Sequence, residues 1–369
     1  MRQAQPLRRW PPVRHVHRLE VRTLFRQYAS VVASHAKVGP AMIRQLRLCV
    51  ALLSIATACS PAETVPTTTT SVVDLSTSST TATTLAPTTT VLVASTTTLA
   101  TEPLGLITPT GVPVAIIEVA GNEFLVTTPC GNTATVSEGE PLSAVAVVID
   151  PGHGGPIDTG AVGSTGTPEK EVNLEVGRLV QSFLSVRNIS AVLTRTADYP
   201  TPLSVRANLA DSLQASLMVS IHHNAPTPGP SDKPGVEVFV QESSDASKRL
   251  GGLLWEHARA GLDVFDVDWV AAADAGVMTV LNTRGDDAYG IIRTPDTPTA
   301  LIELAYISSR PEAELFEDPN YVVVAARAVT DAIERYLTTD EPGSGFVEGR
   351  VFSPNPGVGR DVCVEPDLS

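Results

Sequence analysis

The sequence predicts an α/β fold in which helices cover both faces of a mostly parallel sheet, preceded by a small β-unit. Between residues 144 and 338, near-continuous apolar runs such as "AVAVVID", "SLMVSIHH" and "TALIELAY" alternate with segments that have apolar residues at helical spacing. Strands buried on both faces and separated by helices are typical of parallel sheets. Between residues 102 and 143, short β-branched runs are separated by Pro, Gly and Asn, which predicts three or four strands.

The first segments of the chain predict export. We expect translation to start at Met42, so that residues 1–41 are an upstream extension. Residues 42–59 place two arginines before an apolar run that is too short to span a bilayer and that ends in small residues. This order predicts a secretory signal peptide. Its last residues, "ATAC", resemble a bacterial lipobox, so Cys59 is the predicted lipidation site and the chain is expected to be lipid-anchored or secreted.

Residues 60–101 consist mainly of Thr, Ser, Ala and Pro. Such a segment buries too little apolar surface to offset the loss of chain entropy. We therefore expect a disordered linker that holds the following domains away from the membrane.

The β-unit at residues 102–143 is too short for much stability of its own and is expected to pack against its neighbour. Two cysteines remain after the signal segment, Cys130 in the β-unit and Cys363 in a tail at 339–369 that is predicted to be irregular. In an oxidising environment the two are expected to form a disulfide, although two unpaired thiols would also fit the sequence.

The order of strands and helices follows from the apolar pattern of residues 144–338. Buried strands are predicted at "AVAVVID", "ISAVLTRT", "SLMVSIHH", "GVEVFVQ" and "TALIELAY". Helices are predicted within 172–184, 245–262 and 320–337. The segment 263–293 is harder to interpret, because "GVMTVLN" and "YGIIRT" each fit a strand.

The charge distribution argues against a nucleic-acid partner. The formal net charge is −14, yet the first 47 residues contain ten Lys or Arg and one acidic residue. The rest of the chain is therefore more acidic than the whole and would repel a phosphate backbone.

Four polar residues lie where active sites form in α/β sheets. His153 and His222 follow or end predicted strands, and Glu169 opens the helix after a glycine-rich loop. Glu303 lies in a buried apolar strand, where a carboxylate is costly unless it has a function or a partner. Two imidazoles and one carboxylate can occupy three corners of a zinc tetrahedron and leave the fourth open for water.

The residue types alone leave alternatives open. Glu169 could simply be a first-turn carboxylate favoured by the helix dipole, with Glu171 as the ligand. His222 and His223 point to opposite faces of a continuing strand, so at most one of them faces the metal, and the other lies behind it or faces the substrate. His257, on an amphipathic helix, is expected to be a surface or packing residue.

Four stretches together resemble the zinc-dependent N-acetylmuramoyl-L-alanine amidases of the type 3 amidase family. They are "VVIDPGHGGPIDTGAVGSTGTPEKEVNLEVG", "LTRTADYPTPLSVRANLADSLQASLMVSIHHNA", "GVEVFVQ" and "RTPDTPTALIELAYISSRPEA". The resemblance covers about residues 145–337. It implies that His153, Glu169 and His222 bind Zn²⁺ and that Glu303 is the catalytic carboxylate. Ala305 and Tyr306 depart from the Gly-Phe common in the family.

The resemblance implies a peptidoglycan hydrolase that uses zinc-activated water to cut the amide bond between N-acetylmuramic acid and L-alanine. Its expected setting is the cell envelope, in wall remodelling or daughter-cell separation, with a regulatory protein partner. A zinc peptidase that cuts within the stem peptide is one alternative. A non-catalytic wall-binding lipoprotein is another.

Overall fold

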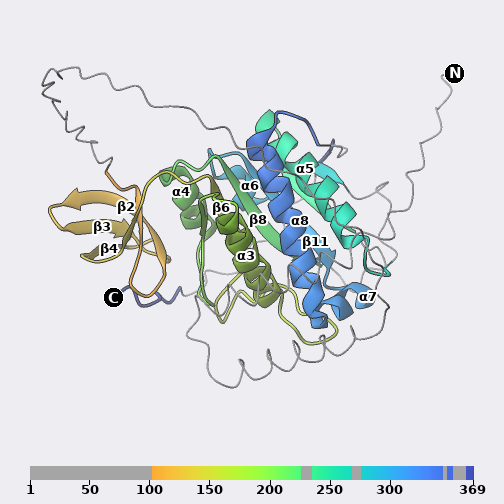
Figure 1. Cartoon of the computed structure of the whole chain (residues 1–369), viewed down its shortest axis with the longest axis horizontal. Coiled ribbons are helices and arrows are strands. Elements are labelled where there is room, and N and C mark those ends of the chain that lie inside the picture. Colours follow the sequence, from red (N-terminus) through yellow and green to blue (C-terminus); the bar gives the residue numbers. More distant parts are fainter. Residues whose placement is uncertain (1–101, 226–234, 268–275, 344–346, 352–362) are drawn as a thin grey trace, which may run out of the picture. The chain divides into compact units, whose positions relative to one another are not determined.

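The computed structural model describes residues 102–225, 235–267, 276–343, 347–351 and 363–369, with backbone only for 347–351 (Figure 1). All of them belong to one compact unit, Thr98–Ser369. The predictions for residues 1–101, including the signal peptide, Cys59 and the linker, lie outside the described residues. Within the described residues, no helix has the length and apolar character needed to cross a bilayer.

The larger sheet has seven strands in the order β12-β10-β9-β11-β8-β6-β7. Neighbouring strands are parallel except for the β11–β9 pair, which is antiparallel. The bounds are β6 Val147–Pro151, β7 Ala191–Leu193, β8 Leu217–Asn224, β9 Glu237–Val240, β10 Val277–Leu281, β11 Thr299–Tyr306 and β12 Val347–Val351. Strands β6 and β11 are buried along their whole length, as their unbroken apolar runs predict.

Helices cover both faces of this sheet, which confirms the predicted fold class (Figure 1). On one face α3, α8 and α5 lie side by side, and on the other α4 contacts α6. The bounds are α3 Glu169–Val186, α4 Leu203–Ser212, α5 Asp245–Leu262, α6 Gly290–Arg293, α7 Arg310–Ala313 and α8 Pro319–Thr338, with a 3₁₀ turn, η2, at Glu314–Glu317. Side-chain caps start two of the long helices, Ser244 at α5 and Asp318 at α8.

Two segments differ from the prediction. "YGIIRT" forms the short helix α6, which contacts α4 and buries Ile291 and Ile292 in the core. The tail predicted to be irregular contains β12, which pairs in parallel with the edge strand β10. The edge strand of a sheet has unpaired backbone N–H and C=O groups, and a five-residue segment can form hydrogen bonds with them. So short a strand has only a weak sequence pattern.

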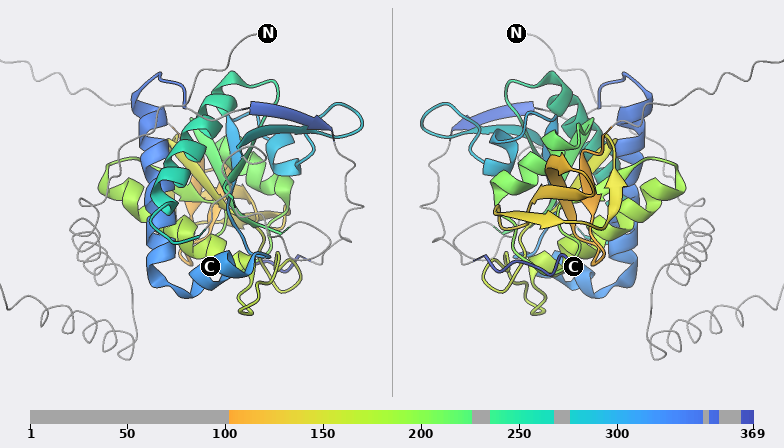
Figure 2. Two further views of the ribbon diagram at one scale, coloured as in Figure 1. Left: turned by 90° about the vertical axis from the view of Figure 1, so that its right-hand side faces the viewer. Right: turned by 90° about the vertical axis from the view of Figure 1, so that its left-hand side faces the viewer.

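The β-unit is a five-stranded antiparallel sheet in the order β4-β3-β2-β1-β5, seen in the right-hand view of Figure 2 in orange and yellow. Its strands are β1 Gly105–Ile107, β2 Pro113–Ala120, β3 Glu123–Thr127, β4 Thr133–Val136 and β5 Glu140–Leu142. The extra strand relative to the predicted three or four arises because β1 and β5 span three residues each, too few to show a period. As expected, the unit packs on its neighbour, since Ala115 shares a core with Leu209 and Leu213 of the α4 region.

The C-terminal residues lie against the β-unit. Cys130 and Cys363 form a disulfide with their Cα atoms 5.6 Å apart. The carboxylate of Glu365 accepts hydrogen bonds from the Cys130 amide at 3.1 Å and the Asn132 side chain at 3.0 Å, and it also bonds Thr128 Oγ1. The tail is therefore held by both a covalent bond and a bound carboxylate.

Candidate metal centre

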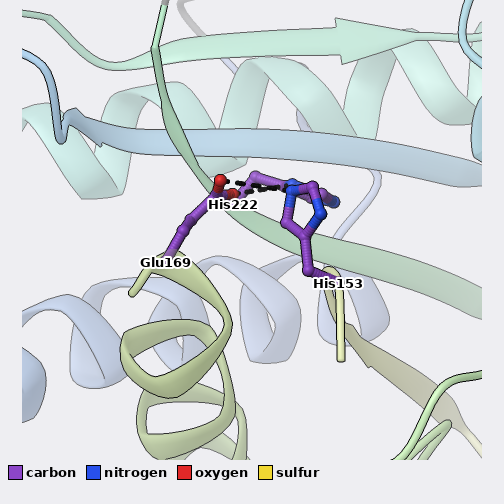
Figure 3. A group of neighbouring side chains, drawn as sticks. All are labelled: His153, Glu169 and His222. Atoms are coloured by element: carbon purple, nitrogen blue, oxygen red, sulfur yellow. Dashed lines mark hydrogen bonds and ion pairs between the residues drawn. The ribbon is translucent and has the colours of Figure 1, made fainter. Parts of the chain in front are cut away.

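The structure brings together the three side chains that the sequence singled out as metal ligands. One donor atom from each of His153, Glu169 and His222 lies within 4.8 Å of the others. Figure 3 shows the carboxylate of Glu169, at the start of α3, directed at both imidazoles. Glu169 Oε2 lies 3.2 Å from His153 Nε2, and Glu169 Oε1 lies 3.0 Å from His222 Nδ1.

Strand register explains this convergence. β6 and β8 are parallel neighbours in which Pro151 pairs with Ile221, so the residues that follow meet at the same edge of the sheet. His222 is the next residue of β8, and His153 follows β6 after one glycine. The loop after His153 then returns to start α3 at Glu169, above that edge. The carboxyl ends of parallel strands are where α/β folds place ligands.

Glycines leave the space in which these ligands approach one another. A Cβ at Gly152 would lie 2.2 Å from the ring of His222. A Cβ at Gly160 would lie 2.5 Å from Glu169 Oε2 and 2.7 Å from His153 Cδ2. His153 itself has φ of 63°, a left-handed conformation that a non-glycine residue adopts only when its surroundings enforce it.

Buried charged groups fix the backbone around His153. Arg206 donates to Asp150 Oδ1 and to the carbonyl oxygen of His153, both at 2.8 Å. Arg195 donates to the carbonyl oxygens of Pro151 and Gly152, both at 2.9 Å. Burial opposes ionisation of Asp150, but Arg206 and hydroxyl donors prevail and lower its pKa. The loop that follows β6 and carries His153 is therefore held by hydrogen bonds from buried charged groups, and such bonds are strong away from solvent.

A second carboxylate orients the His153 ring. Asp158 Oδ1 lies 2.6 Å from His153 Nδ1, which leaves Nε2 directed at Glu169. Burial disfavours the charged imidazole, but Asp158 and Glu169 outweigh it and raise the pKa of His153 to about 10. Burial likewise opposes ionisation of Glu169, and the two imidazoles hold its pKa well below the usual range. The cluster therefore favours an ionised carboxylate at Glu169.

Glu303 lies on β11 in the same row of the sheet as His222. It pairs in register with His222 of β8 on one side and with Glu237 of β9 on the other, and residues paired this way share a face. Its pKa is raised well above the ordinary value, first by burial and then by the negative charges of Glu169 and Glu237. Its Oε2 is buried and has no hydrogen-bond partner among the described residues.

The structure separates the candidates that the residue types left open. Glu171 is exposed on α3, while Glu169 faces the cluster. His223 is buried behind the site, with Nδ1 2.7 Å from Asn173 Oδ1 and Nε2 2.8 Å from the Tyr321 hydroxyl, so it does not face solvent. Burial lowers the pKa of His223 to about 3 and keeps the ring neutral. His257 is partly buried on α5.

The residues present fit a zinc ion. Two imidazoles and a carboxylate are a common ligand set for zinc in hydrolytic sites, and the glycine positions leave them unobstructed. At the same edge of the sheet, the buried Oε2 atom of Glu303 has no hydrogen-bond partner among the described residues. Sequence reasoning missed Asp158, Arg195 and Arg206. A carboxylate five residues after a candidate histidine ligand was a usable signal for Asp158, because metal-binding imidazoles usually donate their other N–H to a carboxylate or carbonyl.

Comparisons with known proteins point to one family. The model of the N-acetylmuramoyl-L-alanine amidase family matches residues 147–335. The chain is 33% identical to N-acetylmuramoyl-L-alanine amidase LytC of Bacillus subtilis, over 56% of this chain and 39% of that protein. It is 26% identical to the amidase AmiC of Neisseria meningitidis, over 52% of this chain and 53% of that protein. It thus spans about half or less of the length of these two relatives.

Among solved structures, amidase AmiC2 of Nostoc punctiforme is 30% identical with a TM-score of 0.43, and the match covers 54% of this chain and 99% of that one. The family match includes all four candidate residues and extends over just more than half of the 369 residues. The chain therefore belongs to the N-acetylmuramoyl-L-alanine amidase family.

Proposed function

We propose that this chain is an exported zinc amidase that hydrolyses the bond between the lactyl group of N-acetylmuramic acid and the L-alanine of the stem peptide. The observation that carries the proposal is the convergence of His153, Glu169 and His222, with Glu303 in the same row of the sheet. Membership of the family supports the choice of bond.

His153, Glu169 and His222 would hold the zinc ion. The chemistry that bound zinc supplies is polarisation of a carbonyl and acidification of water. Of these ligands, His153 is held by Asp158 at its other ring nitrogen, and Glu169 is held by Asn173 at 3.2 Å. These contacts restrict the rotation of both side chains before any metal arrives.

Glu303 would move the proton. Its Oε2 takes a proton from the attacking water, whose oxygen bonds to the lactyl carbonyl carbon, and then gives that proton to the nitrogen of L-alanine as the C–N bond breaks. A raised pKa suits both steps, because a carboxylate with a raised pKa is a stronger base than an ordinary glutamate and its acid form persists long enough to donate. The absence of a competing partner for Oε2 among the described residues keeps that atom free for substrate.

The test is digestion of purified peptidoglycan by wild type and Glu303→Gln, with products identified by mass spectrometry. We expect wild type to release stem peptides with a free L-alanine amine, and the variant to bind zinc while losing at least about 100-fold of the rate. Rates of wild-type size in the variant would exclude Glu303 from proton transfer.

The same digest separates the other candidate functions. A peptidase that cuts within the stem would leave L-alanine attached to muramic acid. A wall-binding protein without catalysis would release nothing yet sediment with the wall. Either result would replace the amidase proposal.

Export by residues 42–59, lipidation at Cys59 and membrane anchoring stay proposals, as does a regulatory protein partner. Incorporation of labelled fatty acid into wild type, but not into Cys59→Ser, would support the anchor. A soluble, unlabelled protein outside the cell would point to plain secretion.

A further inference from the structure

Residues 196–201, which we call the bridging loop, connect β7 to α4 and contact the β-unit on one side. The side chain of Tyr199 is buried in the core of the β-unit with Leu106, Val114 and Val126. Thr196 Oγ1 donates to the carbonyl oxygen of Gly111, between β1 and β2, at 2.9 Å. A tyrosine from outside the β-unit therefore completes its core.

On the side away from the β-unit, the bridging loop binds the backbone close to His153. Asp198 Oδ1 accepts from the Gly155 amide at 2.8 Å, and Asp198 Oδ2 lies 2.7 Å from Lys170 Nζ. Lys170, the neighbour of Glu169 on α3, also donates to the Gly155 carbonyl at 2.8 Å. Asp198 thus links the loop that carries one metal ligand to the helix that carries another.

The bridging loop also packs closely against Gly154 and Gly155. A Cβ at Gly154 would lie 2.5 Å from the Tyr199 carbonyl oxygen, and one at Gly155 would lie 2.8 Å from Pro200 Cδ. Gly154 and Gly155 have φ of 138° and 82°, which glycine adopts readily, but His153 has φ of 63°, which is unusual for a residue with a side chain. A left-handed histidine persists only where its surroundings enforce it, and the bridging loop supplies part of those surroundings.

The C-terminal tail reaches the same place. The Sγ atom of Cys363 lies 3.6 Å from the carbonyl oxygen of Pro200. The disulfide to Cys130 therefore joins the β-unit and the tail beside the bridging loop.

We propose that the β-unit is a structural part of the metal centre: its core fixes Tyr199, and the bridging loop then uses Asp198 as a positioning residue for the loop that carries His153. The inference rests on the proposed function only in naming zinc as the ion. Its consequence is that changes within the β-unit, which contains none of the proposed ligands, lower the affinity for zinc.

The experiment measures zinc affinity of the full chain by competition with a chromophoric chelator, well below the melting temperature of each metal-free variant. Asp198→Ala is expected to weaken zinc binding about tenfold, the lower end of effects seen when groups behind metal ligands are removed. Asp198→Asn, which keeps an acceptor for the Gly155 amide, should recover part of the loss. The control Asp286→Ala also removes a surface aspartate that pairs with a cation, here Arg284, and should leave the affinity unchanged.

A pair of core variants separates positioning from general stability. Val126 in the β-unit and Val329 in α8 are both fully buried, so Val→Ala leaves a similar cavity at each. Only Val126→Ala is expected to weaken zinc binding, by about threefold or more, as expected for partial loss of the support behind a ligand. Equal effects of the two variants, or wild-type affinity in Asp198→Ala, would overturn the proposal.

Zinc binding and turnover are measured apart, so the two proposals fail separately. A wild type that binds zinc but releases no stem peptide would count against the proposed function and leave the comparison of affinities decisive. A wild type that binds no zinc would refute both.

Discussion

Gly160 provides the sharpest test of how the ligands are arranged, through the substitution Gly160→Ala. The added methyl group would lie 2.5 Å from Glu169 Oε2 and 2.7 Å from His153 Cδ2. Gly166, in the same loop, is a matched control, because its φ of 91° is also left-handed but a Cβ there meets nothing within 4 Å. The two alanine variants share the backbone cost and differ in the contact with the ligands.

The structure gives the expected magnitudes. Each substitution places a Cβ in the left-handed region, which costs about 1–2 kcal/mol of stability. At Gly160 the ligand atoms must also retreat by about 1 Å to restore ordinary contact, whereas metal sites tolerate errors of about 0.2 Å in ligand distance. We expect zinc affinity to fall at least about 100-fold in Gly160→Ala, or about 3 kcal/mol, and to stay within about twofold of wild type in Gly166→Ala.

Zinc affinity is measured by competition with a chelator, and stability by thermal denaturation of the metal-free proteins. The expected pattern is similar melting temperatures with widely different affinities. Equal zinc affinities in the two variants would refute the claim that Gly160 makes room for the ligands. A loss of affinity in Gly166→Ala as large as in Gly160→Ala would instead assign the effect to the loop backbone.

Three further predictions concern groups around the site and the fold. Asp158→Ala removes the acceptor at the second nitrogen of His153 and should lower zinc affinity 10–100-fold, with Asp158→Asn less affected because its amide oxygen still accepts; chelator competition measures both. Burial is the main cause that raises the pKa of Glu312 to about 7, above the ordinary 4.5, so its contribution to stability is present below pH 4.5 and lost as pH rises through 7. Urea denaturation between pH 4.5 and 8 should show wild type losing up to about 3 kcal/mol relative to Glu312→Gln, and parallel pH profiles would contradict this. The double variant of Cys130 and Cys363 to serine should lose about 2–5 kcal/mol of unfolding free energy, and an unchanged melting temperature would show that the disulfide contributes nothing.

The sequence predicted those features that depend on a local pattern. Unbroken apolar runs located the buried strands, and the rule that active sites form at strand ends selected His153 and His222. Alternation along a strand also predicted that His222 and His223 face opposite ways, and they do. Glu169 depended on the family resemblance, because a first-turn glutamate has an ordinary explanation as well.

Features that depend on distant contacts could not be predicted. Asp198 and Arg206 look like ordinary surface and helix residues in the sequence, and only the folded chain places them against the backbone near His153. β12 forms because it pairs with the edge strand β10, and the sequence of β12 alone does not predict a strand. The helix α6 could not be told from a strand in the sequence, because two adjacent apolar residues fit a strand buried on both faces as well as a short buried helix.

The disulfide between Cys130 and Cys363 turns most of the described chain into a covalent ring. The two cysteines are 233 positions apart, and the whole of the larger sheet with its helices lies between them. One cut by a protease anywhere in that interval opens the ring without separating its two parts. Nicked molecules would therefore migrate as one species on non-reducing gels and as two on reducing gels. Under the proposed export, one cut in a surface loop would leave all four candidate site residues in the same molecule.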